Sequence, residues 1–395
     1  MSGTLGSIHD NVSYALSLHT RALDKLGEQM ATGSRVNRVS DDPSSASRIL
    51  RLNSQESSLD SHIDAISGSM GALEMSLSMV EELISIYSKA QVDMTQITSG
   101  IYSDDDRDMM ADSINDTLEQ VLSLANTRHM DEYLFSGGST STAPYAATRT
   151  NGEITSVSYQ GSLDNRTIEV AGGLETNIYT VGDEIFRSDS RTTPVFIGDS
   201  GAAAGSSRSS VRGDVWLTVT HDGSNYKLSI DDGASEVTVP GAGDVSNLTV
   251  TDSNTGRILY VDATNITGTG VDMVSVSGTY DIFNVLISTR DILRNDRSLS
   301  DDQVGDLREN ATSAMNEMEN LLVSASVSLG SKVGFLDGIK DSLENMKYDT
   351  GDESMRLEQA DITQLAIDMA QREVLYEMTL LVAADLMSLS LLNFL

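Results

Sequence analysis

The sequence contains 395 residues, of which 39% are apolar and none is a cysteine. This length and apolar content are enough for several domains with buried cores, whereas the lack of cysteine excludes disulfides, thiolate catalysis and cysteine-based metal sites. The 59 acidic and 26 basic residues give a formal net charge of −33, which repels phosphate backbones and anionic membrane surfaces. We therefore expect a folded, multidomain protein with no nucleic-acid partner and no membrane partner.

Neither end of the sequence has the pattern of a common targeting segment. The first residues, Met1–Val12, lack a basic stretch followed by an apolar core, so we expect no secretory signal peptide. The longest apolar stretch, Leu380–Leu395, is shorter than a membrane span and contains polar residues, which disfavours a tail anchor. We expect the protein to stay inside the cell or to leave it by another route.

Two helices are predicted at the start of the chain. Apolar residues recur in steps of four and three over Val12–Met30, and Gly33 is placed to end this helix. After a polar connection, Asp42 is suited to cap a second helix and Pro43 to occupy its first turn. The seam of this second helix is a heptad pattern over Leu52–Tyr87, which is the strongest structural signal in the sequence.

A third helix is predicted near Ser103, whose spacing to Asp106 fits a capping box. After residue 138 the period changes from helical to alternating, which is typical of strands. The alternating runs are Ile154–Tyr159, Thr167–Val170, Val215–Val219 and Lys227–Ile230. The residues His221–Asn225 between two of these runs predict a hairpin turn.

Helical periodicity returns in the last third of the chain. It begins near Tyr280, and a second capping box pairs Ser300 with Gln303 at the start of a long helix. The heptad seam of this helix extends over Val304–Met346, and a last helix covers Ile362–Met387. Long amphipathic helices therefore stand on both sides of a β-rich insert.

This order of elements predicts an α+β multidomain fold, in which long coiled-coil helices from both termini pack together around a central β-rich insert. Isolated helices of about 20 residues are marginal in water, so we expect the ends to become ordered when they pair with each other or with neighbouring subunits. We divide the chain into terminal helices (1–45 and 355–395), a helical bundle (46–138 and 280–354) and a β-rich domain (139–279).

No pattern of a known catalytic or cofactor site is present. The sequence lacks a P-loop, a His-Glu-x-x-His motif and a Gly-x-Ser-x-Gly elbow. Its five histidines are scattered, which makes a metal site improbable. We therefore predict no catalytic residues, no cofactor, no metal ligands and no enzymatic activity.

Several motifs resemble one protein family. The segment Ala31–Pro43, which reads ATGSRVNRVSDDP, resembles the flagellin superfamily, and its Asp-Asp-Pro ending is nearer to the hook-associated members. Further similar segments are Tyr133–Gly138, Tyr159–Gly161, Val181–Phe186, Leu357–Ala366 and Ser388–Leu395. The resemblance covers both helical blocks and the first part of the β region, whereas residues 190–275 carry no diagnostic match.

The resemblance implies a structural subunit of the bacterial flagellum that joins the hook to the filament. It implies export by the flagellar type III apparatus and an extracellular location, with the terminal helices innermost and the β-rich domain outermost. The implied partners are neighbouring copies of the chain, another hook-associated protein, flagellin, and an export chaperone on the C-terminal helix. The best candidates for structural assembly contacts are Leu16, Leu23, Leu26, Leu365, Met369 and Tyr376.

Three other functions stay open. Filament flagellin shares the termini and the helical core, and it would be the dominant protein of sheared filaments. A secreted adhesin or effector with a coiled-coil stalk and a β head belongs to a different class, and a mutant lacking it would keep complete flagella. An enzyme is the most distant alternative, because a site in the unmatched β segment would not show in residue spacing alone.

Overall fold

The computed structural model describes residues 2–99, 103–165, 167–171, 173–177 and 181–392. It divides into two compact units, one formed by Met1–Asp64 with Ile339–Leu395 and the other by Ala65–Gly338. Helices lie at both ends of the chain and a β-rich region lies between them, which confirms the predicted α+β fold class. Within the described residues, no helix is both long enough and apolar enough to cross a membrane.

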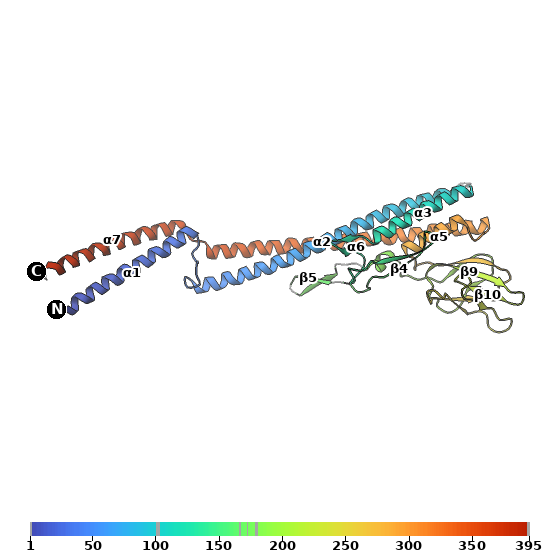
Figure 1. The fold of residues 1–395 in the computed structure, drawn as a ribbon, viewed down its shortest axis with the longest axis horizontal. Helices are drawn as coiled ribbons and strands as arrows, with labels where there is room; N and C mark the ends of the chain where they lie inside the picture. Colours follow the sequence, from blue (N-terminus) through green and yellow to red (C-terminus); the bar gives the residue numbers. More distant parts are fainter. Residues whose placement is uncertain (1, 100–102, 166, 172, 178–180, 393–395) are drawn as a thin grey trace. The chain divides into compact units, whose positions relative to one another are not determined.

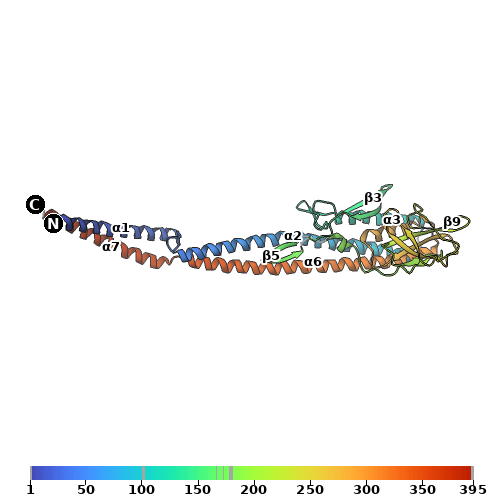
Figure 2. The ribbon, with the colours of Figure 1, turned by 90° about the horizontal axis from the view of Figure 1, so that it is seen from below.

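The first unit contains the pair of terminal helices. Helix α1 (Ser2–Thr32) and helix α7 (Ile362–Leu392) lie side by side and run antiparallel (Figures 1 and 2). Gly33 ends α1 as predicted, with a φ of +69° in the left-handed region that glycine tolerates. The predicted pairing of the two ends is thus present within a single chain.

The long helix α2 (Pro43–Ser99) begins with the predicted cap, because Oδ1 of Asp42 accepts a hydrogen bond from the backbone N–H of Ser45 at 3.1 Å. One line of buried side chains follows the predicted heptad: Leu59, Ile66, Leu73, Val80, Tyr87 and Met94. The second buried line is Ser69, Ser76, Leu83 and Ala90, whereas the predicted Met70, Leu77 and Ile84 are half-buried.

Two of the four residues in this second line are serines, and their buried hydroxyls are satisfied within the helix. Oγ of Ser76 donates to the carbonyl of Ala72 at 2.8 Å, so the buried hydroxyl has a partner. Ser69 bonds the carbonyl of Ala65 in the same way at 2.6 Å. The sequence pattern did not reveal this line, since serine is usually assigned to an exposed helix face.

Helix α6 (Asp301–Glu358) starts with the predicted capping box, in which the backbone N–H of Gln303 donates to Oγ of Ser300 at 3.3 Å and Oε1 of Gln303 accepts from the N–H of Ser300 at 3.2 Å. Its buried line includes the predicted Val304, Leu307, Ala311, Ala314, Met318, Leu329, Leu336 and Leu343. Three seam assignments differ: Leu321 and Ala325 are half-buried, with Leu322 buried beside the first, and Met346 is 47% exposed. A straight α-helix drifts from a strict heptad repeat by about 20° per seven residues, which moves the buried line along a long helix.

Two shorter helices pack against each other in the second unit. Helix α3 (Asp104–Ala125) carries the predicted capping box between Ser103 and Asp106. Helix α5 (Ile282–Arg294) begins two residues after the predicted position, because Asp281 occupies the cap and accepts hydrogen bonds from the backbone of Phe283 and Asn284. The predicted helices are therefore present.

The β region contains several small antiparallel sheets (Figure 1). A five-stranded sheet has the order β11-β10-β9-β14-β7, a three-stranded sheet has the order β12-β13-β8, and three pairs form β1-β2, β3-β4 and β5-β6. The bounds are β1 Arg128–His129, β2 Glu132–Tyr133, β3 Tyr145–Thr150, β4 Glu153–Tyr159, β5 Thr167–Ala171, β6 Leu174–Asn177, β7 Val195–Ile197, β8 Ala203–Ala204, β9 Gly213–His221, β10 Tyr226–Ser229, β11 Val237–Thr238, β12 Leu248–Thr251, β13 Ile258–Asp262 and β14 Gly270–Val276, with a short helix α4 at Gly182–Phe186. The predicted hairpin is confirmed, since β9 and β10 pair from His221 and Tyr226 onward. The two larger sheets share one core that includes Leu217, Leu228, Val250, Leu259 and Val274.

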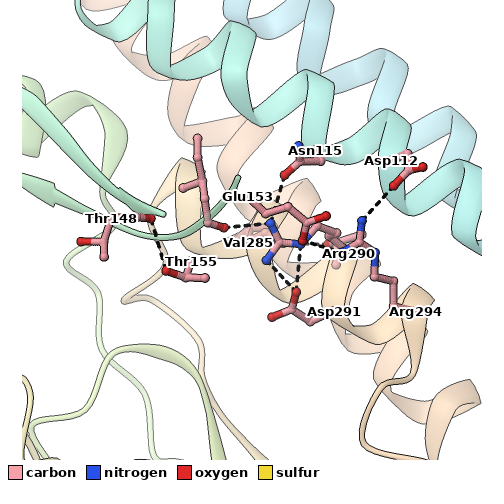
Figure 3. Close-up of polar contacts among 11 residues, drawn as sticks. Asp112, Asn115, Thr148, Glu153, Thr155, Val285, Arg290, Asp291 and Arg294 are labelled. Atoms are coloured by element: carbon pink, nitrogen blue, oxygen red, sulfur yellow. Dashed lines mark hydrogen bonds and ion pairs between the residues drawn. The ribbon is translucent and has the colours of Figure 1, made fainter. Parts of the chain in front are cut away.

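A buried arginine joins the β3-β4 hairpin to the helices (Figure 3). The Arg290 side chain is 4% exposed and donates through Nη1 to the carbonyl of Ile154 at 2.8 Å and to Oδ1 of Asn115 at 3.1 Å. Its Nε and Nη2 donate to Oδ1 of Asp291 at 2.9 and 2.8 Å. Arg294 adds ion pairs to Asp112 and Glu153. These contacts connect α3, β4 and α5 in one polar network.

Candidate assembly interface

The six predicted contact residues all lie on the pair of terminal helices. Leu16, Leu23 and Leu26 of α1 are half-buried, as are Met369 and Tyr376 of α7. Leu365 is buried, with 8% of its surface exposed. In the single chain these side chains follow the helical spacing of a packing seam. Their part in contacts between chains stays a prediction.

Helix α7 also carries a second apolar line, which was not predicted from the sequence. Ile367, Val374 and Leu381 are 47%, 50% and 67% exposed and lie seven residues apart, so they share one face. Each residue of an α-helix is turned by about 100° from the one before it, which places Ile367 roughly opposite Leu365. Helix α7 is therefore apolar on opposite faces. A helix of this kind is normally buried on all sides.

An apolar groove borders the same helices. It has a volume of about 320 Å³ and is lined by Asn11, Val12, Ala15, Leu375, Met378, Thr379 and Val382. Met378 is 57% exposed and Val382 is 53% exposed, so apolar surface of both helices is open there. Covering one such half-exposed side chain contributes about 1 kcal/mol. Several of them on one helix suffice to favour contact with another apolar surface.

Hydrogen bonds join the segment that follows α1 to the end of α6. The backbone N–H of Arg35 donates to the carbonyl of Glu358 at 2.6 Å, and the N–H of Ala360 donates to the carbonyl of Gly33 at 3.0 Å. The Arg35 guanidinium bonds Oδ2 of Asp42 at 3.2 Å and the carbonyl of Leu357 at 3.2 Å. The connection between α1 and α2 is thereby tied to the connection between α6 and α7.

Local hydrogen bonds keep the acidic residues of this connection ionised. The hydrogen bond from the hydroxyl of Ser45 is the largest cause of the lowered pKa of Asp42, and Arg35 adds to it. Lys25, at 3.1 Å from Oδ1 of Asp41, is the main cause of the lowered pKa of Asp41. Both groups are carboxylates at neutral pH, so the connection keeps its ion pairs there.

Among the described residues, no three His, Cys, Asp or Glu side chains gather in a way that could hold a metal ion. The open feature of the first unit is an apolar surface, and its chemistry is that of helix packing.

One protein-family model matches the N-terminal part of the chain. Residues 9–140 match the model of the bacterial flagellin N-terminal helical region. This segment contains α2, α3 and most of α1, together with the Ala31–Pro43 motif. The resemblance of this segment to the flagellin superfamily is thereby confirmed.

Two curated proteins are similar in sequence to part of this chain. The chain is 30% identical over 165 residues to the flagellar hook-associated protein 3 of Escherichia coli K12, and equally to that of Salmonella typhimurium LT2. Each alignment covers 42% of this chain and 50% of the relative, so the chain spans about half the length of the curated relatives it matches.

Solved structures share the fold. The hook associated protein-3 of Legionella pneumophila superposes with a TM-score of 0.53 at 15% identity, covering 78% of this chain and 98% of that one. A putative flagellar hook-associated protein from Vibrio parahaemolyticus gives a TM-score of 0.51 at 13% identity, covering 80% and 99%. These identities are low, so the likeness concerns the fold.

Proposed function

We propose that this chain is a structural subunit of the bacterial flagellum that joins the hook to the flagellin filament. The observation that carries the proposal is the outward apolar line of α7, formed by Ile367, Val374 and Leu381, which lies opposite the face that carries Leu365. Such a surface suits a helix that is enclosed by neighbouring subunits after assembly. The names of the curated relatives support the flagellar junction as the place of that assembly.

In this proposal the terminal helices, residues 1–45 and 355–395, form the innermost layer. The helical bundle of residues 46–138 and 280–354 forms the next layer, and the β-rich domain of residues 139–279 faces outward. The proposed assembly contacts are Leu16, Leu23, Leu26, Leu365, Met369 and Tyr376. The chain acts without catalysis, cofactor or metal.

Delivery is part of the same proposal. The subunit leaves the cell through the flagellar type III apparatus, and an export chaperone covers the apolar surface of α7 before assembly. A helix with exposed apolar residues on several faces is a suitable ligand for a chaperone groove. Outside the cell the partners are neighbouring copies, another hook-associated protein and flagellin.

The test is deletion of the gene in the organism that encodes this chain, followed by electron microscopy and analysis of the medium. We expect hooks without filaments and flagellin lost to the medium, with both defects repaired by the gene on a plasmid. Complete flagella in the deletion strain would contradict the proposal and favour an adhesin. A chain that proves to be the dominant protein of sheared filaments would instead be the filament flagellin.

A further inference from the structure

Four polar side chains form a closed ring of contacts that joins strands β9 and β14 to helix α6. Asp214 belongs to β9, Ser275 to β14 and Asn310 to α6, and Tyr280 lies just before α5. Oδ1 of Asp214 lies 3.1 Å from Oη of Tyr280 and 3.3 Å from Nδ2 of Asn310. Oγ of Ser275 completes the ring, at 2.5 Å from Oη of Tyr280 and 3.1 Å from Oδ1 of Asn310. We call these four residues the polar ring.

Much of the polar ring is buried. Ser275 and Tyr280 are each 1% exposed, and Oδ2 of Asp214 is buried as well. Ser288 of α5 lies near the carboxyl group, but no hydrogen bond reaches Oδ2. A carboxylate with one oxygen buried and without a donor is costly. The site therefore suits a neutral acid better than an anion.

The number of protons in the polar ring depends on the charge of Asp214. Each of the four contacts needs one proton on one of its two atoms. Ser275 and Tyr280 supply one O–H each and the amide of Asn310 supplies one N–H, so an ionised Asp214 leaves one contact without a proton. Turning the amide of Asn310 around does not help, because its oxygen would then face the carboxylate.

A protonated Asp214 supplies the missing proton. The acid then donates to Oη of Tyr280, Tyr280 donates to Oγ of Ser275, and Ser275 donates to Oδ1 of Asn310. Nδ2 of Asn310 donates back to the hydroxyl oxygen of the acid. All four contacts become hydrogen bonds, and successive hydrogen bonds in such a chain strengthen one another.

The groups that face Asp214 from the neighbouring elements are uncharged, apart from the titratable hydroxyl of Tyr280. They are Ser275 of β14, Asn284 and Ser288 of α5, and Asn310 of α6.

The cleft that Asp214 also borders carries opposite charges in equal number. Its cations are Arg187, Arg212, Arg257 and Arg297, and its other carboxyl groups are those of Asp183, Asp232, Asp252 and Asp281. Burial is the largest influence on Asp214 and raises the pKa of its carboxyl to about 6. This direction agrees with the count of protons, because both favour the neutral acid in the folded chain.

We propose that Asp214 is protonated at mildly acidic pH and that the polar ring is a pH-sensitive latch, which fastens β9 to α5 and α6 and opens towards neutral pH. When the carboxyl group releases its proton to water, one hydrogen bond is lost and a buried anion remains. Water must reach Oδ2 to stabilise this anion, so ionisation favours local opening at the start of β9. The inference concerns the second unit alone. Its failure would leave the proposed function unchanged.

Hydrogen exchange at two backbone amides measures the opening of the latch. The N–H of Gly213 donates to Oγ1 of Thr279 at 2.8 Å, and the N–H of Asp214 donates to Oδ1 of Asn284 at 3.3 Å. In the purified full chain, we expect their protection, corrected for intrinsic exchange, to fall at least about tenfold between pH 4 and pH 7. The amides of β13, which belongs to the other large sheet, should keep their protection. Protection of the two amides that does not depend on pH would overturn the inference.

The matched variant for this measurement is Asp214→Asn, which cannot ionise. Its amide offers N–H donors in place of the carboxyl proton, so the polar ring can close at every pH. We expect the protection at residues 213 and 214 of this variant to be the same at pH 4 and pH 7. Fluorescence of Trp216, the single tryptophan, checks that the variant is folded. A pH dependence that persists in Asp214→Asn would assign the opening to another group and overturn the inference.

Substitution of Tyr280 decides which atom of the polar ring donates. If the neutral acid donates to Tyr280 and the ionised form opens to water, Tyr280→Phe removes an acceptor of the neutral form, and the pKa of Asp214 should fall. If Asp214 is instead a closed-in carboxylate that accepts from Tyr280, the same substitution removes a donor and raises the pKa. Carbon-13 NMR of the carboxyl groups measures this pKa, with the Asp214 signal identified by its loss in Asp214→Asn.

The control for Tyr280→Phe is Tyr226→Phe. Oη of Tyr226 donates to the carbonyl of Thr267 at 2.9 Å, so this variant also loses a tyrosine hydrogen bond but leaves the polar ring intact. The pKa of Asp214 should be the same in Tyr226→Phe as in the natural chain. A pKa that is raised or unchanged in Tyr280→Phe would overturn the inference.

Discussion

The two units of the chain differ in how completely they cover their own apolar residues. In residues 65–338, side chains such as Leu73, Val80 and Phe135 are at most 1% exposed, and buried polar groups such as Arg290 have partners. Among residues 10–32 and 362–387 of the terminal helices, Leu365 is the one buried apolar side chain. The second unit therefore has a buried core of its own, whereas the apolar side chains of the helix pair are mostly half-buried or exposed. In the proposed assembly a different molecule covers them.

The largest effect of a single substitution is expected in the core of the second unit. Leu73→Ala removes a side chain that is 1% exposed, so the free energy of unfolding should fall by about 2 to 5 kcal/mol. The matched control is Met75→Ala on the same helix, where 36% of the side chain is exposed and the loss should be much smaller. Denaturant unfolding followed by Trp216 fluorescence measures both. Equal losses of stability in the two variants would contradict the expectation that the buried side chain contributes more.

The polar network of Figure 3 should give the next largest effect. Arg290→Met leaves the carbonyl of Ile154 and the amide of Asn115 without their buried donor, and we expect a loss of about 2 to 4 kcal/mol. Arg51→Met, at an exposed position of α2, is the control and should change stability by less than about 0.5 kcal/mol. An Arg290→Met protein as stable as the control would show that the network does not hold the hairpin.

Asp214 makes the stability of the second unit depend on pH. Burial raises the pKa of this carboxyl from 3.8 to about 6, although Tyr280 and Asn310 bond its Oδ1 at 3.1 and 3.3 Å. The raised pKa means that the folded state prefers the neutral acid. The contribution of Asp214 to the free energy of unfolding is complete below about pH 4. It is lost as the pH rises through 6, and the loss is at most about 3 kcal/mol.

The variant Asp214→Asn removes this titration while it keeps the Oδ1 acceptor. We expect the variant to match the natural chain near pH 4, and to be more stable than it at pH 7.5. Unfolding curves between pH 4 and 8 measure the difference. A natural chain that loses no stability relative to Asp214→Asn between pH 5 and 7 would contradict the assignment.

The smallest effect is expected at the connection between the helix pairs. Arg35→Ala removes hydrogen bonds from an arginine whose side chain is 48% exposed, so the loss of stability should be about 1 kcal/mol or less. Protease cleavage between residues 33 and 42 should nevertheless become faster, because the tie to the carbonyl of Leu357 is lost. Arg35→Lys retains the charge but not the several N–H donors of the guanidinium. Its cleavage rate should lie between those of the natural chain and Arg35→Ala. An unchanged cleavage rate in Arg35→Ala would show that the backbone contacts alone hold the connection.

Periodicity predicted much of the fold because helix caps and heptads are local signals. The cap at Asp42, the boxes at Ser103 and Ser300, and the end at Gly33 depend on a few neighbouring residues, and all are present. The buried serine line of α2 was missed, since burial of a hydroxyl depends on a helix that is distant in sequence.

The candidate interface stays a prediction, made from helical spacing alone. Its residues are Leu16, Leu23, Leu26, Leu365, Met369 and Tyr376. The outward line of Ile367, Val374 and Leu381 is also spaced by sevens, but a single amphipathic seam was assumed for α7.

The central claim is that the outward face of α7 is completed by neighbouring subunits. The most direct measurement replaces Val374 and Leu381 by glutamine in a plasmid copy of the gene and counts filaments in the deletion strain. The purified double variant should unfold as the natural chain does, because both residues are at least 50% exposed, while filaments should be absent although the variant is still exported. Normal filaments on cells that carry only the double variant would contradict the account.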